Sequence, residues 1–562
     1  MTNLNPNSLP FTRMTGVGLI LATLALFLPA LGNHDWWYPD EPDVALPIIE
    51  MASRGDWVVP THNGTPWLDY PPLAYWPSLA ISHLWGGVNP WTTRLPMLLA
   101  FCVLLMSTLL IARELDYPST AFMSGVILLG TPVLWLNATQ LQVDIGFAAA
   151  QTFGFAAYLR GNRLRGLGGW GWRALGFAGF GLAILGKGPL GILLPGLVLS
   201  CWHCWNREWS RILSLGPLAL VSLLVAAPWY FSLTQRLGTD FVVNELYLQN
   251  FDRFQAANRG HGGKGFHYYI KSLLVDFLPW SFLVVPALWH GFKQRRNEKS
   301  WRLLAAWILA PLIFFTLAST KRNVYLLPIY PPLAMLVAGW LGSSLSVGQA
   351  RFQRQVALGW SGILAIVGGL LLVAGMIWPA LIIHFSTGRL SLDHLRALRP
   401  GLLVIGPTLL VSSSIAIISA KRASSWVWPL LSATGALLWS MAMALVLPVI
   451  DQQRSYAPAA KWLVEQAKPN HVIGYYWPGR DASKRPAWLC HLEGRRLIFF
   501  NSPVEARMWL AADTKRIVLT TPPLVQELNP VSVEALWKIS STDWAVVRGD
   551  GVREEDVFHG QP

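Results

Sequence analysis

Long uninterrupted apolar runs dominate the chain and alternate with short polar loops. Each run has about 18 to 25 residues, the length that an α-helix needs to cross the hydrocarbon core of a bilayer. The segment 71–86 is an exception, because it is short and begins with two prolines, and we expect a helix lying at the membrane interface there. The pattern predicts a polytopic α-helical membrane protein with about thirteen crossings, near residues 14–32, 94–112, 120–138, 141–159, 173–186, 188–205, 212–234, 269–290, 301–318, 323–342, 356–383, 401–419 and 425–447.

Basic residues give this scheme an orientation. Loops rich in lysine and arginine fall on one side, which the positive-inside rule makes cytoplasmic: 160–166, 206–211, 293–299, 351–354 and 421–422. The N-terminus is then inside. The loops at about 33–93 and 235–268 and the tail lie outside.

The tail differs in pattern from the rest of the chain. Helix-like and strand-like segments alternate in residues 449–562, which predicts a small α/β domain on the outer, periplasmic side. Residues 1–448 form the membrane domain in this division.

Composition supports a membrane protein and excludes other classes. Charged residues make up 13% of the 562 residues, against about 25% in soluble domains. The net charge of +14 does not indicate nucleic-acid binding, because no basic stripe has interleaved aromatic residues. The four cysteines suggest neither a disulfide framework nor a metal or redox site: Cys102, Cys201, Cys204 and Cys490.

Acidic residues are crowded where the first apolar run ends. Asp40, Glu41 and Asp43 lie within nine residues, at the predicted start of a helix. A helix N-terminus needs one capping side chain, and Asp43 suits its first turn, so the Asp40–Glu41 pair is surplus and indicates function. Asp144 begins a later helix and could serve function or the helix dipole equally well, whereas Asp69 precedes a double proline, where a turn residue is expected.

Basic residues also lie on the predicted outer side. Lys187 interrupts two apolar runs between glycines, and either snorkels to the interface or meets an anionic headgroup. Lys321 and Arg322 occupy a short outer loop, against the positive-inside rule, and phosphate binding would explain them. Further basic residues in the second outer loop bind the same anion or are simply solvated: Arg253, His261 and Lys264.

Acids and bases on one face suit group transfer from a phosphate-linked donor. A carboxylate can activate an acceptor hydroxyl or amine, and cations can take up the charge that develops on a departing phosphate. No G-x-G-x-x-G nucleotide fingerprint opens a predicted strand–helix unit, which fits a lipid donor.

Several segments resemble a known family. In family order over about residues 14–345, the chain is similar to the lipid-linked-sugar glycosyltransferases of the GT-C superfamily, to lipid A aminoarabinose transferase, and more distantly to protein mannosyltransferases. The matching segments are 39–76, 88–96, 140–147, 182–195, 227–231, 250–263, 277–281 and 319–334. The resemblance implies thirteen membrane helices in a GT-C fold and a polyprenyl-phosphate sugar as donor.

The resemblance also implies roles for individual residues. Asp40 corresponds to the catalytic or acceptor-orienting acid, with Glu41 beside it, and Asp144 corresponds to the second essential acid. Lys187 matches the lysine of the family's KGP segment, and either Tyr325 or Tyr330 represents a family tyrosine. Many relatives have a lysine before the double proline where this chain has Tyr70, which can donate a hydrogen bond but cannot neutralise charge.

The sequence therefore predicts an integral-membrane glycosyltransferase of the bacterial inner membrane, with its active site facing the periplasm. It transfers a sugar from a polyprenyl-phosphate donor to lipid A, another glycan or a protein. No cofactor is required; a divalent metal between two of the acids is compatible with the pattern but not demanded by it. The alternative is a transporter or flippase for lipid-linked saccharides, which would have charges strung through the midplane and broken helices in paired halves.

Overall fold

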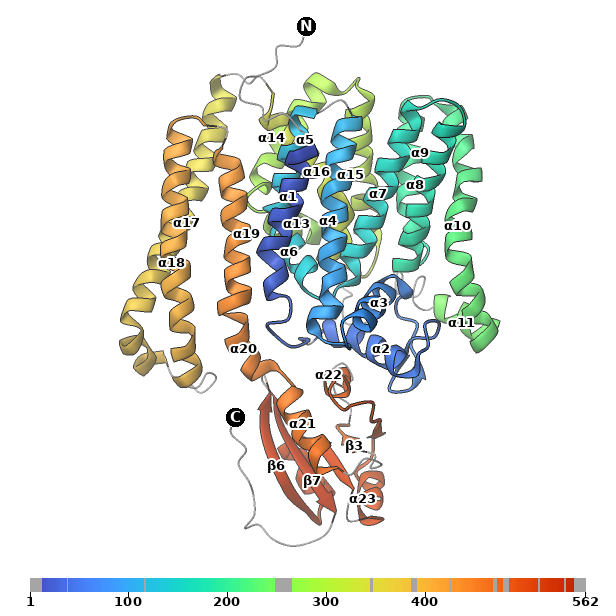
Figure 1. Ribbon diagram of the computed structural model, residues 1–562, viewed down its shortest axis with the longest axis vertical. Helices are drawn as coiled ribbons and strands as arrows, with labels where there is room; N and C mark the ends of the chain where they lie inside the picture. The colour runs from blue at the N-terminus through green and yellow to red at the C-terminus, as the bar shows by residue number, and fades with distance from the viewer. Residues whose placement is uncertain are drawn as a thin grey trace. The chain divides into compact units, whose positions relative to one another are not determined.

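Helices form in every apolar run that hydropathy marked as a membrane crossing (Figure 1). The computed structural model describes residues 13–37, 39–115, 118–247, 265–343, 347–385, 392–424, 426–467, 473–478, 485–513, 516–539 and 542–549. The chain divides into two compact units. The first comprises 1–31, 68–77 and 94–446, and the second comprises 32–67, 78–93 and 447–562.

The first unit is built from helices, most of them apolar. In chain order its elements, including α3, which lies mostly in the second unit, and α4, whose first four residues lie there, are α1 (Arg13–Phe27), η1 (Leu28–Ala30), η2 (Pro72–Ala74), α3 (Trp76–Leu84), α4 (Pro90–Glu114), α5 (Pro118–Leu129), α6 (Pro132–Thr139), α7 (Val143–Arg163), α8 (Gly166–Lys187), α9 (Leu190–Trp205), α10 (Trp209–Leu237), α11 (Thr239–Tyr247), α13 (Tyr268–Asp276), α14 (Ser281–Arg295), α15 (Lys299–Leu317), η4 (Asn323–Ile329), α16 (Tyr330–Leu341), α17 (Val347–Phe385), α18 (Leu392–Lys421) and α19 (Val427–Leu445).

Several of these helices are long and apolar enough to cross a membrane. Within the described ranges there are seven such helices, or up to nine if each bent helix pair is one span. The chain is therefore a multi-pass helical membrane protein, as predicted. The predicted runs 120–138 and 269–290 form the bent pairs α5–α6 and α13–α14, with angles of 65° and 107°. Proline lies at or beside each break, at Pro132 and Pro279, where it removes a helical hydrogen-bond donor.

The predicted interface segment 71–86 does not form a crossing helix. It contains the single turn η2 and the nine-residue helix α3. At about 1.5 Å per residue, a helix of this length falls far short of a bilayer's hydrocarbon core of about 30 Å.

Glycine lets the backbones of α7 and α8 approach closely along their length (Figure 1). A Cβ atom at Gly154 would lie 2.8 Å from the carbonyl oxygen of Gly176, and one at Gly176 would lie 2.7 Å from that of Gly154. Phe155 also stacks 4.0 Å from Trp307, centroid to centroid, in a buried aromatic cluster. Small residues at helix contacts are typical of membrane bundles, where dispersion replaces the hydrophobic effect between helices.

The second unit contains a five-stranded mixed sheet formed by the tail. Its strand order is β4-β3-β5-β7-β6; β3 pairs in parallel with β4 and β5, and the other two pairings are antiparallel. The predicted α/β character of the tail is confirmed. Its elements are α20 (Leu447–Arg454), α21 (Ala457–Gln466), β3 (Ile473–Tyr476), α22 (Arg485–Leu489), β4 (Leu497–Phe500), α23 (Pro503–Ala511), β5 (Ile517–Thr520), α24 (Pro522–Val525), η6 (Gln526–Leu528), β6 (Val531–Ile539) and β7 (Thr542–Gly549).

The same unit includes most of the first predicted outer loop, a grouping that the sequence did not indicate. After α2 (Glu41–Arg54), the short strands β1 (Thr61–His62) and β2 (Thr65–Pro66) form a hairpin. Its turn residues, Asn63 and Gly64, both have positive φ angles, 54° and 78°, which the two-residue Asn-Gly turn favours. The Asn63 amide donates to the Leu497 carbonyl at 2.8 Å and accepts from the Leu497 N–H at 3.0 Å, and so pairs with the edge strand β4.

We expect Gly154→Ala to lower the thermal stability of the detergent-solubilised protein, because the added methyl group would force α7 and α8 apart. Overpacking of this kind costs about 1–3 kcal/mol. The matched control is Gly196→Ala in the interior of α9, where an added Cβ atom meets nothing within 4 Å. That change should be neutral or slightly stabilising, because alanine is the better helix former. Equal melting temperatures for the two variants would contradict the proposed packing.

Candidate functional site

A buried ion pair joins the start of α7 to the end of α8. The Lys187 ammonium donates to Asp144 Oδ1, and the two side chains are only 11% and 4% exposed. Asp144 lies in the first turn of α7 and Lys187 is the last residue of α8. Each charge therefore also has a favourable position relative to its own helix dipole. Two residues that the sequence singled out for separate reasons are thus brought together.

Aromatic rings surround the ammonium group of this pair. Lys187 Nζ lies 4.9 Å from the centroid of the Tyr325 ring and 5.7 Å from that of Phe147. Tyr325 belongs to η4, which packs against α7 and α15. Of the two tyrosines that the resemblance offered, Tyr325 is the one placed beside Lys187. Tyr330 is fully buried, with its ring 5.5 Å from that of Phe277.

Glycines beside the pair allow a close approach of the backbone. Gly188 ends α8 with φ 60° and ψ −144°, a conformation that other residues avoid, and its N–H donates to the Ile184 carbonyl at 2.8 Å. Leu73 of η2 packs against Gly186, where an added Cβ atom would lie 3.2 Å from Leu73 Cδ2. The η2 turn contacts both α7 and α8. The half-buried Asp69 and Tyr70, just before this turn, are thereby brought to the same region as the ion pair.

The two cations of the short loop before η4 differ in exposure. Lys321 is 5% exposed and donates to the Ala318 carbonyl at 2.5 Å. Arg322 is half-buried, and its carbonyl accepts from the Tyr325 N–H at 3.2 Å. Lys321 thus bonds to the backbone of its own loop. This loop leads directly into η4, which contains Tyr325.

The predicted acidic pair lies at the start of α2, in the second unit. Asp40 occupies the N-cap position but makes no capping hydrogen bond with its side chain. Glu41 is 2% exposed, and its Oε2 accepts from the Trp37 N–H at 2.9 Å. Asp43 lies 3.8 Å from His62 Nε2. Glu41 therefore bonds the backbone at this helix start, where the Asp40 side chain does not act as the cap.

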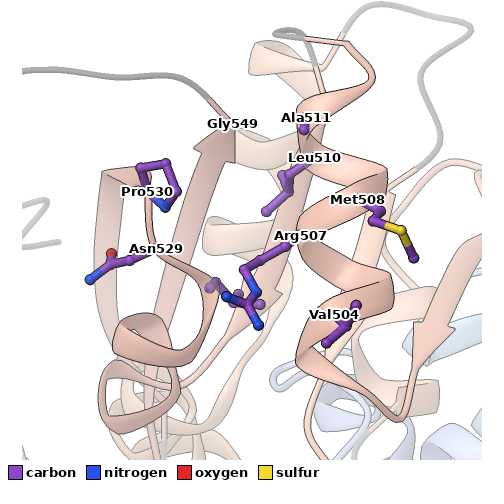
Figure 2. Close-up of a pocket in the computed structure, with 9 residues that line it drawn as sticks. Val504, Arg507, Met508, Leu510, Ala511, Asn529, Pro530 and Gly549 are labelled. Carbon is purple, nitrogen blue, oxygen red and sulfur yellow. The ribbon is translucent and has the colours of Figure 1, made fainter.

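The basic residues of the second outer loop, groups of potential metal ligands and a cavity in the tail add no residue to this site. Arg253, His261 and Lys264 lie outside the described residues. In the described part of the chain, no group of three or more His, Cys, Asp or Glu residues could hold a metal ion. A cavity of about 390 Å³ lies in the tail, between α23 and the turn before β6, with Arg507 as its charged residue (Figure 2). None of the predicted site residues lines it.

Sequence reasoning did not identify Asp276 as a candidate. This half-buried residue ends α13 at the bent break, and its Oδ2 atom is buried without a hydrogen-bond partner among the described residues. The helix α13 packs against η4, the element of Tyr325. An acid inside a predicted crossing was the available signal, because ionisable groups within membrane segments are costly and mark function.

Comparisons with known proteins agree with this picture. The sequence model of the dolichyl-phosphate-mannose-protein mannosyltransferase family matches residues 13–240. An undecaprenyl phosphate-alpha-4-amino-4-deoxy-L-arabinose arabinosyl transferase from Pseudomonas aeruginosa is 31% identical over 371 residues, 65% of each chain. A second, from Pseudomonas fluorescens, is 29% identical over 367 residues, 64% of each chain. The chain thus matches slightly less than two thirds of the length of these relatives.

Solved structures extend the likeness to the fold. ArnT from Cupriavidus metallidurans, in a crystal structure bound to undecaprenyl phosphate, superposes with a TM-score of 0.75 at 21% identity, over 95% of this chain and 98% of that one. The oligosaccharyltransferase of Archaeoglobus fulgidus gives a TM-score of 0.52 at 12% identity, over 91% of this chain and 69% of that one. The resemblance expected from the sequence is therefore confirmed: residues 13–240 match the protein mannosyltransferase family model, the chain is similar to the aminoarabinose transferases at about 30% identity, and its fold is similar to that of ArnT.

Proposed function

We propose that the protein is a membrane glycosyltransferase that takes a sugar from a polyprenyl-phosphate donor. The observation that carries the proposal is the buried Lys187–Asp144 pair beside Tyr325, where glycines lie on either side of Lys187 in the sequence. Charges held inside a membrane bundle are expensive, and they persist chiefly where substrates need them. The aminoarabinose transferases that the chain resembles use an undecaprenyl-phosphate-linked sugar, by their names, which supports this donor class.

Lys187 is the residue we assign to the donor phosphate. An ammonium group released in part from Asp144 can bind the phosphate and take up charge as the phosphate departs. Asp144 orients the Lys187 ammonium through their ion pair. Tyr325 and Tyr70 can donate hydrogen bonds to the donor, as can Arg322, whereas Lys321 is already bonded to its own loop. Arg253, His261 and Asp69 stay predictions for the same headgroup.

Asp40 is the residue we assign to the acceptor. In the proposed step, an acceptor hydroxyl or amine attacks the anomeric carbon and transfers its proton to the Asp40 carboxylate. The bond between the anomeric carbon and the phosphate oxygen breaks, and its electron pair goes to the departing polyprenyl phosphate. Glu41 supports this step indirectly, because its bond to the Trp37 N–H holds the start of α2. The step needs no cofactor.

The acceptor and the membrane orientation also belong to the proposal. We place the chain in a bacterial inner membrane with thirteen crossings, the N-terminus in the cytoplasm, and Asp40 and the tail in the periplasm. Lipid A is the acceptor that the resemblance of the sequence suggests, whereas the names of the relatives give the donor sugar and not the acceptor. Another glycan or a protein stays open.

We expect Asp40→Asn to reduce sugar transfer by about 10²–10⁴-fold, the usual contribution of a general base. The measurement is mass spectrometry of envelope lipids and glycoproteins from a deletion strain that expresses each variant at matched level. Loss of one sugar from one product class in the deletion strain would identify the reaction. Glu505→Gln, in the first turn of α23 in the same unit, is the control and should restore that sugar fully. Full transfer by Asp40→Asn would overturn the role assigned to Asp40.

We expect removal of one charge of the Asp144–Lys187 pair to lower stability, and removal of both charges to restore stability but not transfer. Asp144→Asn alone leaves a buried ammonium without its partner, which costs about 3–5 kcal/mol of stability. Combining it with Lys187→Met removes both charges and should restore the melting temperature while transfer stays absent. Arg160→Gln is the control and should change neither quantity, because Arg160 is 49% exposed and Arg163 keeps a second pair with Glu114. If the double variant regains transfer, the pair is structural and Lys187 does not bind the phosphate.

A further inference from the structure

Two of the residues just before Asp40, Asp35 and Trp37, are bonded to the tail. The Asp35 carboxylate is 7% exposed, and its Oδ2 accepts from Ser455 Oγ at 2.6 Å and lies 2.9 Å from His491 Nε2. Its other oxygen, Oδ1, accepts from the Trp36 N–H at 2.7 Å. Burial alone would raise the pKa of this carboxyl, but the hydrogen bond and charge of His491, with the Ser455 hydrogen bond, hold the pKa below its ordinary value. Asp35 therefore stays charged and bound to two tail residues at neutral pH.

A second tail carboxylate holds the adjoining residues. Asp451 Oδ1 accepts from the Asp35 N–H at 3.0 Å and from Trp37 Nε1 at 2.6 Å. The Arg454 guanidinium lies 5.0 Å from the centroid of the Trp37 ring. The backbone N–H of Trp37 in turn donates to Glu41, the first residue of α2. A continuous series of hydrogen bonds thus runs from the tail to the helix start at which Asp40 lies.

The tail also contacts the chain on the other side of Asp40. Cys490, directly before His491, is buried and lies with its sulfur 3.8 Å from the Pro42 carbonyl oxygen. The helix α22, which precedes Cys490, packs against α2. Farther along, Asn63 pairs with the edge strand β4 through two hydrogen bonds. Asp40 is therefore flanked in sequence by segments that residues about 400 positions later hold in place.

We propose that the tail is a positioning element for the start of α2, and that His491 positions Asp40 through its ion pair with Asp35. This inference rests on the role proposed for Asp40. It assigns the tail a function in the transfer reaction itself, as the part of the protein that fixes the helix start at which the base lies. Misplacing a reacting group by about 1 Å can cost about 10²-fold in rate, so a residue that touches no substrate can still control turnover.

The test combines hydrogen exchange with transfer in the full-length protein. We expect His491→Ala to raise amide exchange in peptides covering 35–46 and to lower transfer about 100-fold. Binding of undecaprenyl phosphate, the bare lipid phosphate used as probe, should be unchanged because its proposed ligands lie in the other unit. His491→Gln keeps a nitrogen donor toward Asp35 and should restore most of both properties. Arg548→Gln, which breaks the β6–β7 ion pair with Glu534, is the control in the same domain and should resemble wild type.

Each outcome decides between the two proposals. If His491→Ala leaves both exchange in 35–46 and transfer at wild-type levels, the positioning inference is wrong although Asp40 can still be the base. If exchange rises throughout β3–β7 as well, the His491→Ala variant has lost its fold. Asp35→Asn, which keeps the side-chain shape and removes the charge, then takes the place of His491→Ala in the same comparison. If Asp40→Asn transfers normally, the proposed function fails, while the exchange result still shows whether the tail holds this segment.

Discussion

The pairing of buried charge is the constraint on which both units depend. A lone ammonium or carboxylate in a low-dielectric interior costs several kcal/mol, so each must have a partner where the helices meet. The Lys187–Asp144 pair satisfies this requirement in the helical unit, at the ends of two helices whose dipoles favour both charges. Because each partner belongs to a different helix, the pair also sets where the end of α8 lies relative to the start of α7. Tyr325 and the glycines on either side of Lys187 lie around the ammonium group of this pair.

Buried charge is also paired in the second unit, but with partners of a different kind. Asp35 is also buried, with 7% of its side chain exposed against 4% for Asp144, and its partners include a histidine, a hydroxyl group and a backbone N–H. The histidine and the hydroxyl group come from the tail, whose strands β3, β4 and β5 have four residues each. The loop and the tail thus stabilise each other, which explains why they group as one unit. The start of α2, where Asp40 lies, thereby gains a defined position.

Much of the fold could be predicted from the sequence because membrane spans are a local property. A run of about 20 apolar residues has to satisfy its own backbone hydrogen bonds in lipid, and the helix is the solution that needs no distant partner. Every predicted crossing accordingly contains a helix, and alternation in the tail indicated the α/β sheet. The bends at Pro132 and Pro279 were not predicted. Hydropathy gives the length of an apolar segment. Whether the helix bends within that segment also depends on which side chains from other helices pack at the break.

The sequence by itself determined the apolar helices and the mixed character of the tail. It also singled out Asp40, Asp144 and Lys187 as charged residues next to apolar segments. Only the tertiary structure decided the partners: Lys187 with Asp144 and Tyr325, and Trp37 with Asp451, 414 residues away. Helix formation depends on neighbours within a few turns, and those neighbours can be read along the chain. The pairing of buried polar groups depends on which distant segments pack together, because each group takes whichever partner the fold brings within hydrogen-bond distance.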